Sequence, residues 1–262
     1  MASNILPLAT LGGAAVLAAL AATQAFKSDP GLETAEAAFG FEFTDQDAFR
    51  NEVRAYLLDN PEVIMEAIEV LEVRQQEAQA ISDADRVAAV LPDLYSTPGS
   101  WSGGNPDGDI ILVEFVDYRC GYCRRAHDEV RELIASDGNI RIITKEFPIL
   151  GEASLISSQF AIAVLQLGGD AAYATVNDQL IRLRGNPDEP TLSQIAIELG
   201  LDAAAVFERM QSPEVAAVIN ANRAVADSLD IRGTPTFVMN DQLIRGYLPL
   251  DAMEAAVAEL RG

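Results

Sequence analysis

The feature that most constrains the fold is a pair of cysteines placed between an apolar segment and a helical one. Residues Ile110–Val116 are apolar except for one glutamate, which is typical of a buried strand. Cys120-Gly-Tyr-Cys123 follows after three intervening residues, and a helical pattern then extends to about Ser136. Residues Ile140–Glu146 have the composition of a second strand. The sequence therefore predicts a βαβ unit whose helix begins at the cysteines, an arrangement typical of redox-active thiols.

The start of a helix makes the first of these thiols reactive. Free backbone N–H groups and partial positive charge at a helix N-terminus favour the Cys120 thiolate. Cys123 lies one turn later and deeper, so we expect it to resolve the mixed disulfide that Cys120 forms. The basic residues Arg119, Arg124 and Arg125 are expected to favour the thiolate further, unless the last two lie on a solvated helix face. No organic cofactor is expected, because the electrons reside in the sulfur atoms.

Glu114 is a second candidate for the site, because it interrupts the apolar strand six residues before Cys120. Burying a carboxylate is costly, so a buried carboxyl at this position is expected to have a raised pKa. Such a group near Cys123 could accept the proton of that thiol as the thiol attacks a mixed disulfide. The alternative is a residue at a strand edge that points to solvent.

His127 is the only histidine in the sequence and lies four residues after Cys123. This spacing places it on the cysteine face of the expected helix. With Cys120 and Cys123 it could form a site for Cu(I) or zinc; otherwise it is a polar residue packed beneath the redox helix. Three ligands on one short helix form an incomplete shell, so we predict no metal.

The charge of the chain excludes one large class of partners. Forty acidic residues oppose 18 basic ones, a formal net charge of −22, and such a surface repels nucleic acid and anionic membranes. With two cysteines in the whole chain, a disulfide-rich scaffold is also excluded. The chain can still bury a sizeable core, because 49% of its residues are hydrophobic.

The N-terminal segment indicates export. Residues 1–27 contain a nearly uncharged run rich in Ala and Leu that ends at Lys27. About 20 apolar residues are long enough to span a bilayer as a helix, and the small residues of the run also suit a signal peptidase. We therefore expect a cleaved signal peptide or an inner-membrane anchor, then a linker at 28–40, and a periplasmic location for the rest.

Residues 41–91 are expected to form helices before the redox domain. Asn60 and Pro61 are typical of a helix start, and apolar residues recur after them at spacings of three and four, which indicates an amphipathic helix. Its apolar stripe needs a partner. Self-association into a homo-oligomer and docking onto the rest of the chain both satisfy this requirement.

The region 92–262 is expected to form one α/β domain. Prolines and glycines crowd into 92–109, which predicts a break in regular structure. Helical patterning dominates about 152–230, and this part is expected to be an insertion between two halves of a sheet. The second half is predicted to contain strands at Thr236–Met239 and Gln242–Arg245, followed by a final helix at 250–260.

Three ordered motifs resemble those of the DsbA-like branch of the thioredoxin superfamily. They are Glu114-Phe-Val-Asp-Tyr-Arg-Cys-Gly-Tyr-Cys123, Lys145-Glu-Phe-Pro-Ile-Leu-Gly151 and Arg232-Gly-Thr-Pro-Thr-Phe-Val238. The resemblance extends from about residue 104 to the C-terminus and implies a thioredoxin-like fold with a helical insertion. The segment from Phe41 to about Ala80 resembles the N-terminal helices of ScsC, the suppressor-of-copper-sensitivity proteins, some of which oligomerise through that region.

The resemblance also implies residue roles. Cys120 is the attacking thiol and Cys123 the resolving one, with a cis-proline facing them. The Gly-Tyr pair between the cysteines departs from the Pro-His of the oxidase DsbA. Together with a threonine before the proline, it is similar to the isomerase DsbC. Substrates are expected to contact the cis-proline loop and the two residues between the thiols, namely Thr234, Pro235, Gly121 and Tyr122.

These observations predict a periplasmic thiol–disulfide oxidoreductase that acts on unfolded or misoxidised exported proteins. We expect an isomerase or a reductase, with a membrane redox partner that resets the cysteines. A monomeric disulfide oxidase of DsbA type and a copper-binding redox chaperone are the alternatives. Reduction potential distinguishes the directions of electron flow, and a few tens of millivolts change the equilibrium about tenfold.

Overall fold

The computed structural model describes residues 46–96 and 98–262, so the predicted leader, the linker and the start of the helical segment lie outside the described residues. By compactness the chain divides into Met1–Glu66 and Ala67–Gly262. The described helices are α2 (Gln46–Asp59), α3 (Glu62–Tyr95), α4 (Gly121–Asp137), α5 (Glu152–Arg182), α6 (Glu189–Glu198), α7 (Ala203–Met210), α8 (Pro213–Ser228) and α9 (Leu250–Arg261). The strands are β1 (Trp101–Gly104), β2 (Ile110–Val116), β3 (Ile140–Glu146), β4 (Thr236–Met239) and β5 (Gln242–Arg245).

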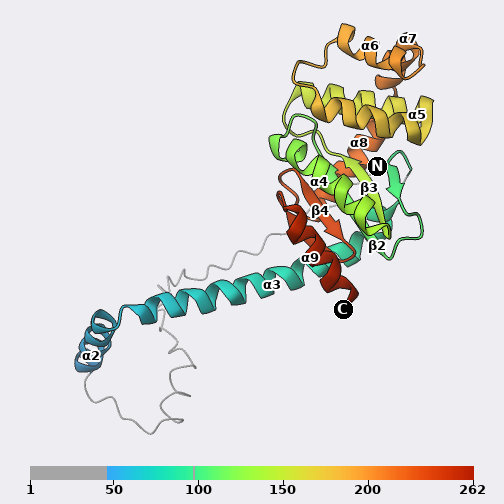
Figure 1. The fold of residues 1–262 in the computed structure, drawn as a ribbon. Coiled ribbons are helices and arrows are strands. Elements are labelled where there is room, and N and C mark those ends of the chain that lie inside the picture. Colours follow the sequence, from blue (N-terminus) through green and yellow to red (C-terminus); the bar gives the residue numbers. More distant parts are fainter. Residues whose placement is uncertain (1–45, 97) are drawn as a thin grey trace, which may run out of the picture. The chain divides into compact units, whose positions relative to one another are not determined.

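The five strands form one mixed sheet in the order β1-β3-β2-β4-β5 (Figure 1). β2 and β3 are parallel and joined by α4, so the predicted βαβ unit is confirmed. β4 pairs antiparallel with β2, and β5 pairs antiparallel with β4. The turn between β4 and β5 contains Asn240 in a left-handed conformation (φ 52°). This is a thioredoxin-like fold. The four strands that the sequence predicts, now β2, β3, β4 and β5, begin and end at the predicted residues.

The sheet separates two hydrophobic layers. Alternate side chains of a strand point to opposite faces, so Val113 and Phe115 of β2 face one layer, and Leu112 and Glu114 face the other. The first layer is completed by α3 and α8, and the second by α4 and α9. Figure 1 shows α4 and α9 together over the same side of the sheet. Glu114 therefore points toward the layer that contains the cysteine helix.

The helical insertion lies between β3 and β4 and comprises α5 to α8, in agreement with the expected position. α5 contains a kink at Gly169 (φ 76°, ψ −172°), where the sequence pattern changes from one helix to the next. Asp188, Asp202 and Ser212 cap α6, α7 and α8 by accepting backbone N–H groups, as is usual for these residue types. Among the described residues, α5 alone is long and apolar enough to cross a membrane. Its buried residues pack in the largest core cluster, as in the core helix of a globular domain.

The boundary between the helical segment and the redox domain differs from the expected one. α3 begins directly after Asn60 and Pro61, but it continues through Pro92 instead of ending at residue 91. Val87 and Leu94 of α3 are fully buried in the layer with α8. The last turns of this helix therefore belong to the redox domain. The boundary between the two compact units, after Glu66, also lies before the expected domain boundary after residue 91.

Lys145 helps to fix the end of α3. Its Nζ donates to the carbonyl oxygens of Ser96 (2.7 Å) and Asp93 (3.3 Å), where the helix leaves carbonyl groups without intrahelical partners. Burial lowers the pKa of Lys145 to about 8. Asp83 of the same helix accepts hydrogen bonds from the Arg245 guanidinium of β5. Two charged contacts thus attach α3 to the sheet.

β1 lies within the segment that the sequence predicted to be a break. It pairs antiparallel with β3, from Trp101 opposite Thr144 to Gly104 opposite Arg141. Glycine is depleted in strands, and two of the four residues of β1 are glycines, which explains why the pattern hid it. Trp101 stacks on Tyr173 of α5, with 5.5 Å between the ring centroids.

Candidate active site

The two cysteines occupy the first turn of α4. Cys120 is the N-cap residue (φ −76°, ψ 123°) and Cys123 follows within the helix; both thiols are free. Cys120 is 7% exposed and Cys123 is fully buried. The Cys120 thiol lies 3.1 Å from the carbonyl oxygen of Thr234. The Thr234–Pro235 peptide bond is cis, as the family resemblance implied, so the predicted loop and the predicted thiols meet in space.

The structure gives the two thiols opposite acidities. Hydrogen bonds with Cys123, with Thr234 and with the backbone of the first helical turn lower the pKa of Cys120 to about 5. Burial, followed by the hydrogen bond to Cys120, raises the pKa of Cys123 far above its usual range. At neutral pH the first thiol is therefore a thiolate and the second retains its proton. This difference suits an attacking and a resolving thiol.

Arg119 and Arg124 bind the helical insertion, whereas the sequence predicted that they favour the Cys120 thiolate. Arg119 donates to the carbonyl oxygens of Leu183 and Gly185, and Arg124 donates to that of Ile181 at 2.8 Å. The carbonyl groups of Ile181 and Leu183 lie at the C-terminal end of α5, where a helix needs external donors, and that of Gly185 lies in the loop that follows. The two guanidinium groups thus attach the active-site turn to the helical insertion. Neither is among the main causes of the lowered pKa of Cys120.

Glu114 is a buried acid, and the alternative of a solvent-facing residue at a strand edge is wrong. β2 lies between β3 and β4, and Glu114 is only 7% exposed. Burial, and then the charge of Glu146, raise the pKa of Glu114 to about 7. The charge of Glu114 in turn raises the pKa of Cys123. The structure therefore places a carboxyl of raised pKa within electrostatic reach of the resolving thiol.

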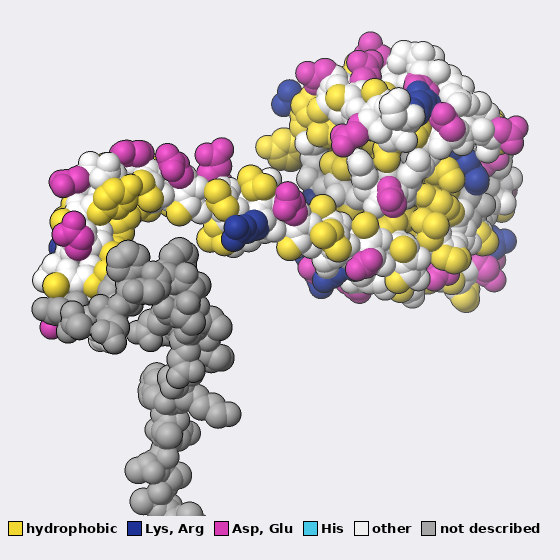
Figure 2. All heavy atoms as spheres, turned by 90° about the horizontal axis from the view of Figure 1, so that it is seen from below, with side chains coloured by type: hydrophobic (Ala, Val, Ile, Leu, Met, Phe, Trp, Pro, Cys, Tyr) yellow, Lys and Arg dark blue, Asp and Glu magenta, His cyan; other side chains and the backbone are white. Residues whose placement is uncertain are grey.

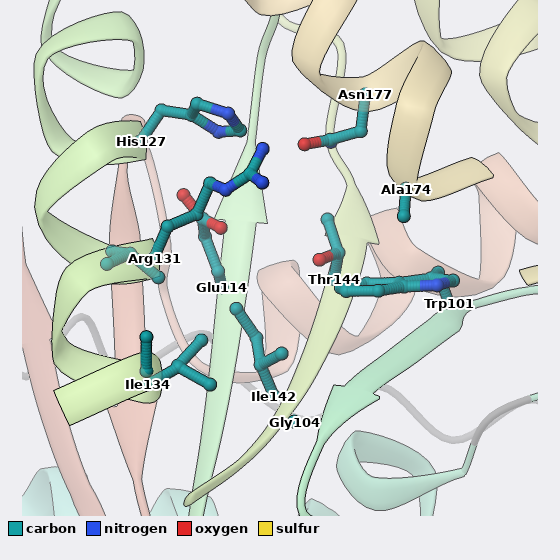
Figure 3. Close-up of a pocket in the computed structure, with 12 residues that line it drawn as sticks. Trp101, Gly104, Glu114, His127, Arg131, Ile134, Ile142, Thr144, Ala174 and Asn177 are labelled. Carbon is teal, nitrogen blue, oxygen red and sulfur yellow. The ribbon is translucent and has the colours of Figure 1, made fainter. Parts of the chain in front are cut away.

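A cavity of about 230 Å³ gives the Glu114 carboxyl access to solvent. Figure 3 shows this carboxyl pointing into the cavity, with His127 and Arg131 of α4 on one side and Asn177 of α5 on the other. Trp101 lies on the same side as Asn177 and forms part of the wall that faces α4. The Arg131 side chain is 60% exposed, so the cavity reaches the surface. A proton on Glu114 can exchange through it without passing the thiols.

His127 faces this cavity and interacts with an aspartate. Its Nε2 lies 3.0 Å from Asp178 Oδ1 of α5, and burial lowers the pKa of the imidazole although Asp178 acts in the opposite direction. Within residues 46–96 and 98–262, no group of three or more His, Cys, Asp or Glu side chains is arranged to hold a metal ion. The interpretation of His127 as a third ligand beside the cysteines therefore has no geometric support.

Asp117 is a buried residue of the site that sequence reasoning missed. It is fully buried, and its carboxylate accepts the backbone N–H groups of Arg119 (2.8 Å), Ile149 (2.8 Å) and Leu150 (3.0 Å). Its own carbonyl accepts the N–H of Cys120 at 3.0 Å. One side chain thus joins the active-site turn to the loop after β3. The signal in the sequence was an acid directly after a buried strand.

Glu146 is a second buried acid that sequence reasoning missed. It is 2% exposed at the end of β3, and three hydroxyl groups donate to its carboxylate. They belong to Tyr118 (2.7 Å), Ser158 (2.7 Å) and Tyr173 (2.6 Å). Tyr118 lies two residues before Cys120, so this cluster links the active-site segment to α5. The position of Glu146 at the end of an apolar strand was the available signal.

The residues between the cysteines lie at the surface. Tyr122 is 62% exposed, and a Cβ added to Gly121 would meet nothing within 4 Å. The Tyr122 ring stacks on Tyr247, with 6.2 Å between centroids, and the Arg125 guanidinium lies 4.6 Å from the Tyr247 ring centre. Both carboxylate oxygens of Glu129 accept the Tyr247 hydroxyl. The fold thus builds an aromatic shelf, Tyr122 and Tyr247, beside the reactive thiol.

The sheet order, the cysteine pair at a helix start and the facing cis-proline define a thioredoxin-like fold of the thiol–disulfide oxidoreductase type. A protein family described as thioredoxin matches residues 96–259, and the copper resistance protein ScsC N-terminal domain matches residues 45–78. The first match covers more than half of the chain. The chain belongs to this thioredoxin family, and its residues 45–78 are similar to the N-terminal domain of ScsC.

Solved structures agree with this assignment. A thioredoxin-like oxidoreductase from Silicibacter pomeroyi DSS-3 is 38% identical, covers 65% of this chain and 96% of its own, and has a TM-score of 0.60. BcfH from Salmonella enterica Typhimurium is 26% identical over 89% of this chain and 100% of its own, with a TM-score of 0.70. The catalytic domain of Proteus mirabilis ScsC, 23% identical over 67% of this chain and 97% of its own with a TM-score of 0.61, shares the fold.

The curated relatives are much longer proteins. The Na(+)/H(+) antiporter NhaA 1 of Salinispora arenicola is 29% identical over 154 residues, which cover 59% of this chain and 24% of the antiporter. The antiporter NhaA 3 of Salinispora tropica matches to the same extent at 27% identity. The chain thus spans about a quarter of the length of the curated relatives it matches.

Proposed function

We propose that this protein exchanges disulfides with exported polypeptides through Cys120 and Cys123. The single observation that carries the proposal is the opposite acidity of the two thiols at one helix start, beside the Thr234–Pro235 loop. The Cys120 thiolate attacks a substrate disulfide, so that a Cys120–substrate disulfide forms and one substrate thiolate leaves. A lowered thiol pKa makes this attack efficient at neutral pH.

Resolution of the mixed disulfide is assigned to Cys123 and Glu114. The Glu114 carboxylate takes the proton of the Cys123 thiol, and the resulting thiolate attacks the Cys120 sulfur. A Cys120–Cys123 disulfide forms, the Cys120–substrate bond breaks, and the substrate sulfur leaves with the electron pair. The proton on Glu114 then leaves through the cavity that this carboxyl lines. A base with a pKa near the working pH is the most effective for such a transfer.

The substrate surface is proposed to comprise the cis-proline loop and the aromatic shelf. The Thr234 backbone lies beside Cys120, and we expect an extended substrate segment to pair with it, as in strand addition to an edge. Gly121 leaves room for that segment, and the exposed Tyr122 ring offers it apolar area. Rigid, half-exposed aromatic rings are typical anchors for polypeptide partners.

The direction of exchange is proposed to be isomerisation or reduction. The pKa of Cys120, about 5, lies between the values of about 3.5 and 7 for a strong oxidase and for thioredoxin. The substrates are unfolded or misoxidised exported proteins in the periplasm, and a membrane redox partner returns the cysteines to the active state. The apolar leader supports export. The chemistry again requires no organic cofactor.

A second copy of the chain is the proposed partner of the N-terminal helices. Apolar side chains of α2 and of the first half of α3 remain exposed in the described chain, and Figure 2 shows hydrophobic side chains exposed along these helices. Exposed apolar faces of this extent are typical of association surfaces. The residues concerned, with exposed fractions from 40% to 69%, include Val53, Tyr56, Leu58, Ile64, Met65, Ile68 and Leu71.

The test is trapping combined with refolding of a scrambled-disulfide protein. Cys123→Ser should accumulate mixed disulfides with the substrate, because the attacking thiol lacks its resolving partner. Cys120→Ser should form none. The full chain should recover native substrate from scrambled substrate when supplied in the reduced state. A protein that oxidises reduced substrate but leaves scrambled substrate unchanged is an oxidase, and a Cys123→Ser variant that traps nothing contradicts the assigned thiol roles.

A further inference from the structure

The environment of Glu146 stabilises its negative charge. The three groups that donate to its carboxylate are all hydroxyl groups, at 2.6–2.7 Å, which is the range of charge-assisted O–H···O⁻ bonds. A protonated carboxyl would have to use one oxygen as a donor and give up part of this arrangement. Burial raises the pKa of Glu146 to about 7, and the three hydroxyl groups act against that rise.

Glu114 lies close to Glu146 and lacks such donors. In the parallel pairing of β2 and β3, Glu114 is opposite Thr144, so Glu146 lies two residues further along the same face. Within the described chain, no hydrogen bond or ion pair reaches the Glu114 carboxyl. Two carboxyls that share a buried site resist double ionisation and lose their protons in two separate steps. The donors assign the first ionisation to Glu146, which leaves the later proton on Glu114.

We propose that Glu146 is a positioning residue of the exchange reaction, which ionises before the neighbouring Glu114 and whose negative charge makes the Glu114 carboxylate a stronger base toward Cys123. The inference rests on the proposed function, because it concerns the proton that the resolving step moves. The proton passes from the Cys123 sulfur to a Glu114 oxygen, while Glu146 stays ionised and exchanges nothing. The other titratable or charged groups around the two acids are Asp117, Tyr118, Cys123, His127, Arg131 and Tyr173.

A second consequence concerns Tyr118. Its hydroxyl donates to Glu146 and accepts from Asn177 Nδ2 at 3.1 Å. Removing the glutamate therefore also disturbs the anchor of the active-site segment, and loss of activity alone would not separate a structural role from an electrostatic one. The experiment needs a direct reading of the Glu114 carboxyl.

The test is the titration of Glu114 in the full, reduced chain by carboxyl ¹³C NMR, with the signal assigned by its loss in Glu114→Gln. Glu146→Gln keeps the shape of the side chain and removes its charge. The Glu114 midpoint is expected to fall by about one pH unit, as for removal of a like charge from a shared buried site. The pH profile of mixed-disulfide resolution should move in the same direction. A midpoint that stays in place or rises overturns the inference.

Two neighbouring serines provide a matched pair if Glu146→Gln does not fold. Ser158→Ala removes one donor from Glu146, so that Glu146 retains its proton longer and the Glu114 midpoint should fall. Ser157→Ala removes a buried hydroxyl of the same helix that donates to the Ala153 carbonyl instead, and it should leave the midpoint unchanged. Equal midpoints in the two variants refute the inference. Failure of Cys123→Ser to trap substrate refutes the proposed function instead, whatever the titration shows.

Discussion

Replacing Glu114 by glutamine should make the protein more stable and the exchange slower. Folding raises the pKa of Glu114 from 4.5 to about 7. The folded state therefore binds the proton more tightly than the unfolded state. Below pH 4.5 this difference in pKa does not change the free energy of unfolding relative to a neutral side chain. As the pH rises toward 7, it lowers the free energy of unfolding steadily. At about 1.4 kcal/mol for each pH unit, the full cost is about 3 kcal/mol.

The assay is urea unfolding of the reduced protein, followed through the fluorescence of Trp101, which is the single tryptophan. Glu114→Gln should be more stable than the original protein by about 3 kcal/mol at pH 8 and nearly equal to it at pH 4. Glu132→Gln, which changes an exposed carboxyl of α4, should show no such difference. The reasoning is refuted if the gain is the same at both pH values or if Glu114→Gln is destabilised at pH 8.

The same substitution should slow the resolving step. Loss of a general base typically costs about 10²-fold or more, and the step to be measured is the decay of a preformed Cys120 mixed disulfide. The initial attack by Cys120 should be almost unchanged, because the main causes of its low pKa are the hydrogen bonds at the helix start. Equal decay rates in the two proteins would remove Glu114 from the reaction.

Three further predictions follow from the contacts around the site. Asp117→Ala should lower the free energy of unfolding by about 3 kcal/mol in urea titrations, since three buried N–H groups lose their acceptor; a change within experimental error contradicts the proposed link. Tyr247→Ala should raise KM for a polypeptide disulfide several-fold and leave kcat nearly unchanged, because it removes support for the aromatic shelf and not for the thiols; an equal fall in kcat argues against a binding role. Ile68→Glu together with Leu71→Glu should convert an oligomer to a monomer in light scattering, whereas Glu69→Gln should not; an unchanged mass excludes this face as the interface.

Much of the fold was accessible from local sequence patterns. β2 and β3 are buried on both faces of the sheet, so their residues are mostly apolar and often β-branched. The ends of these apolar runs in the sequence therefore coincide with the ends of the strands. The capping residues of the insertion, such as Asp202 and Ser212, mark helix starts by a local mechanism that needs no tertiary information. β1 was missed because Gly103 and Gly104 carry no strand signal, and only pairing with β3 makes this segment a strand.

The site was predictable where chemistry is encoded locally. The cysteine pair and Glu114 stand out because a reactive thiol needs a helix start and a carboxyl in an apolar strand is costly. Asp117 and Glu146 were not predicted to belong to the site, because their partners come from distant segments that only the fold brings together. The arginines were misjudged for a related reason: the carbonyl groups that they bind lie at the end of α5, some sixty residues later.

The end of α3 shows a similar limit of sequence reasoning. Pro92 is a strong local signal for a helix end, but buried Leu94 and the Lys145 ammonium stabilise one further turn. Tertiary contacts therefore override the local preference at this position. The helical segment consequently reaches into the redox domain, and variants near residue 90 should be designed as core variants of that domain.

The central claim is that Cys120 is a reactive thiolate at neutral pH, whereas Cys123 stays protonated until it resolves the mixed disulfide. The most direct measurement is the rate of alkylation of the reduced protein as a function of pH, with each modified cysteine identified by mass spectrometry. Cys120 should react with a midpoint near pH 5, the value to which its pKa is lowered, and Cys123 should remain unmodified in the folded protein across the neutral range. Equal reactivity of the two thiols, or a Cys120 midpoint near the ordinary value of 9.0, would contradict this account.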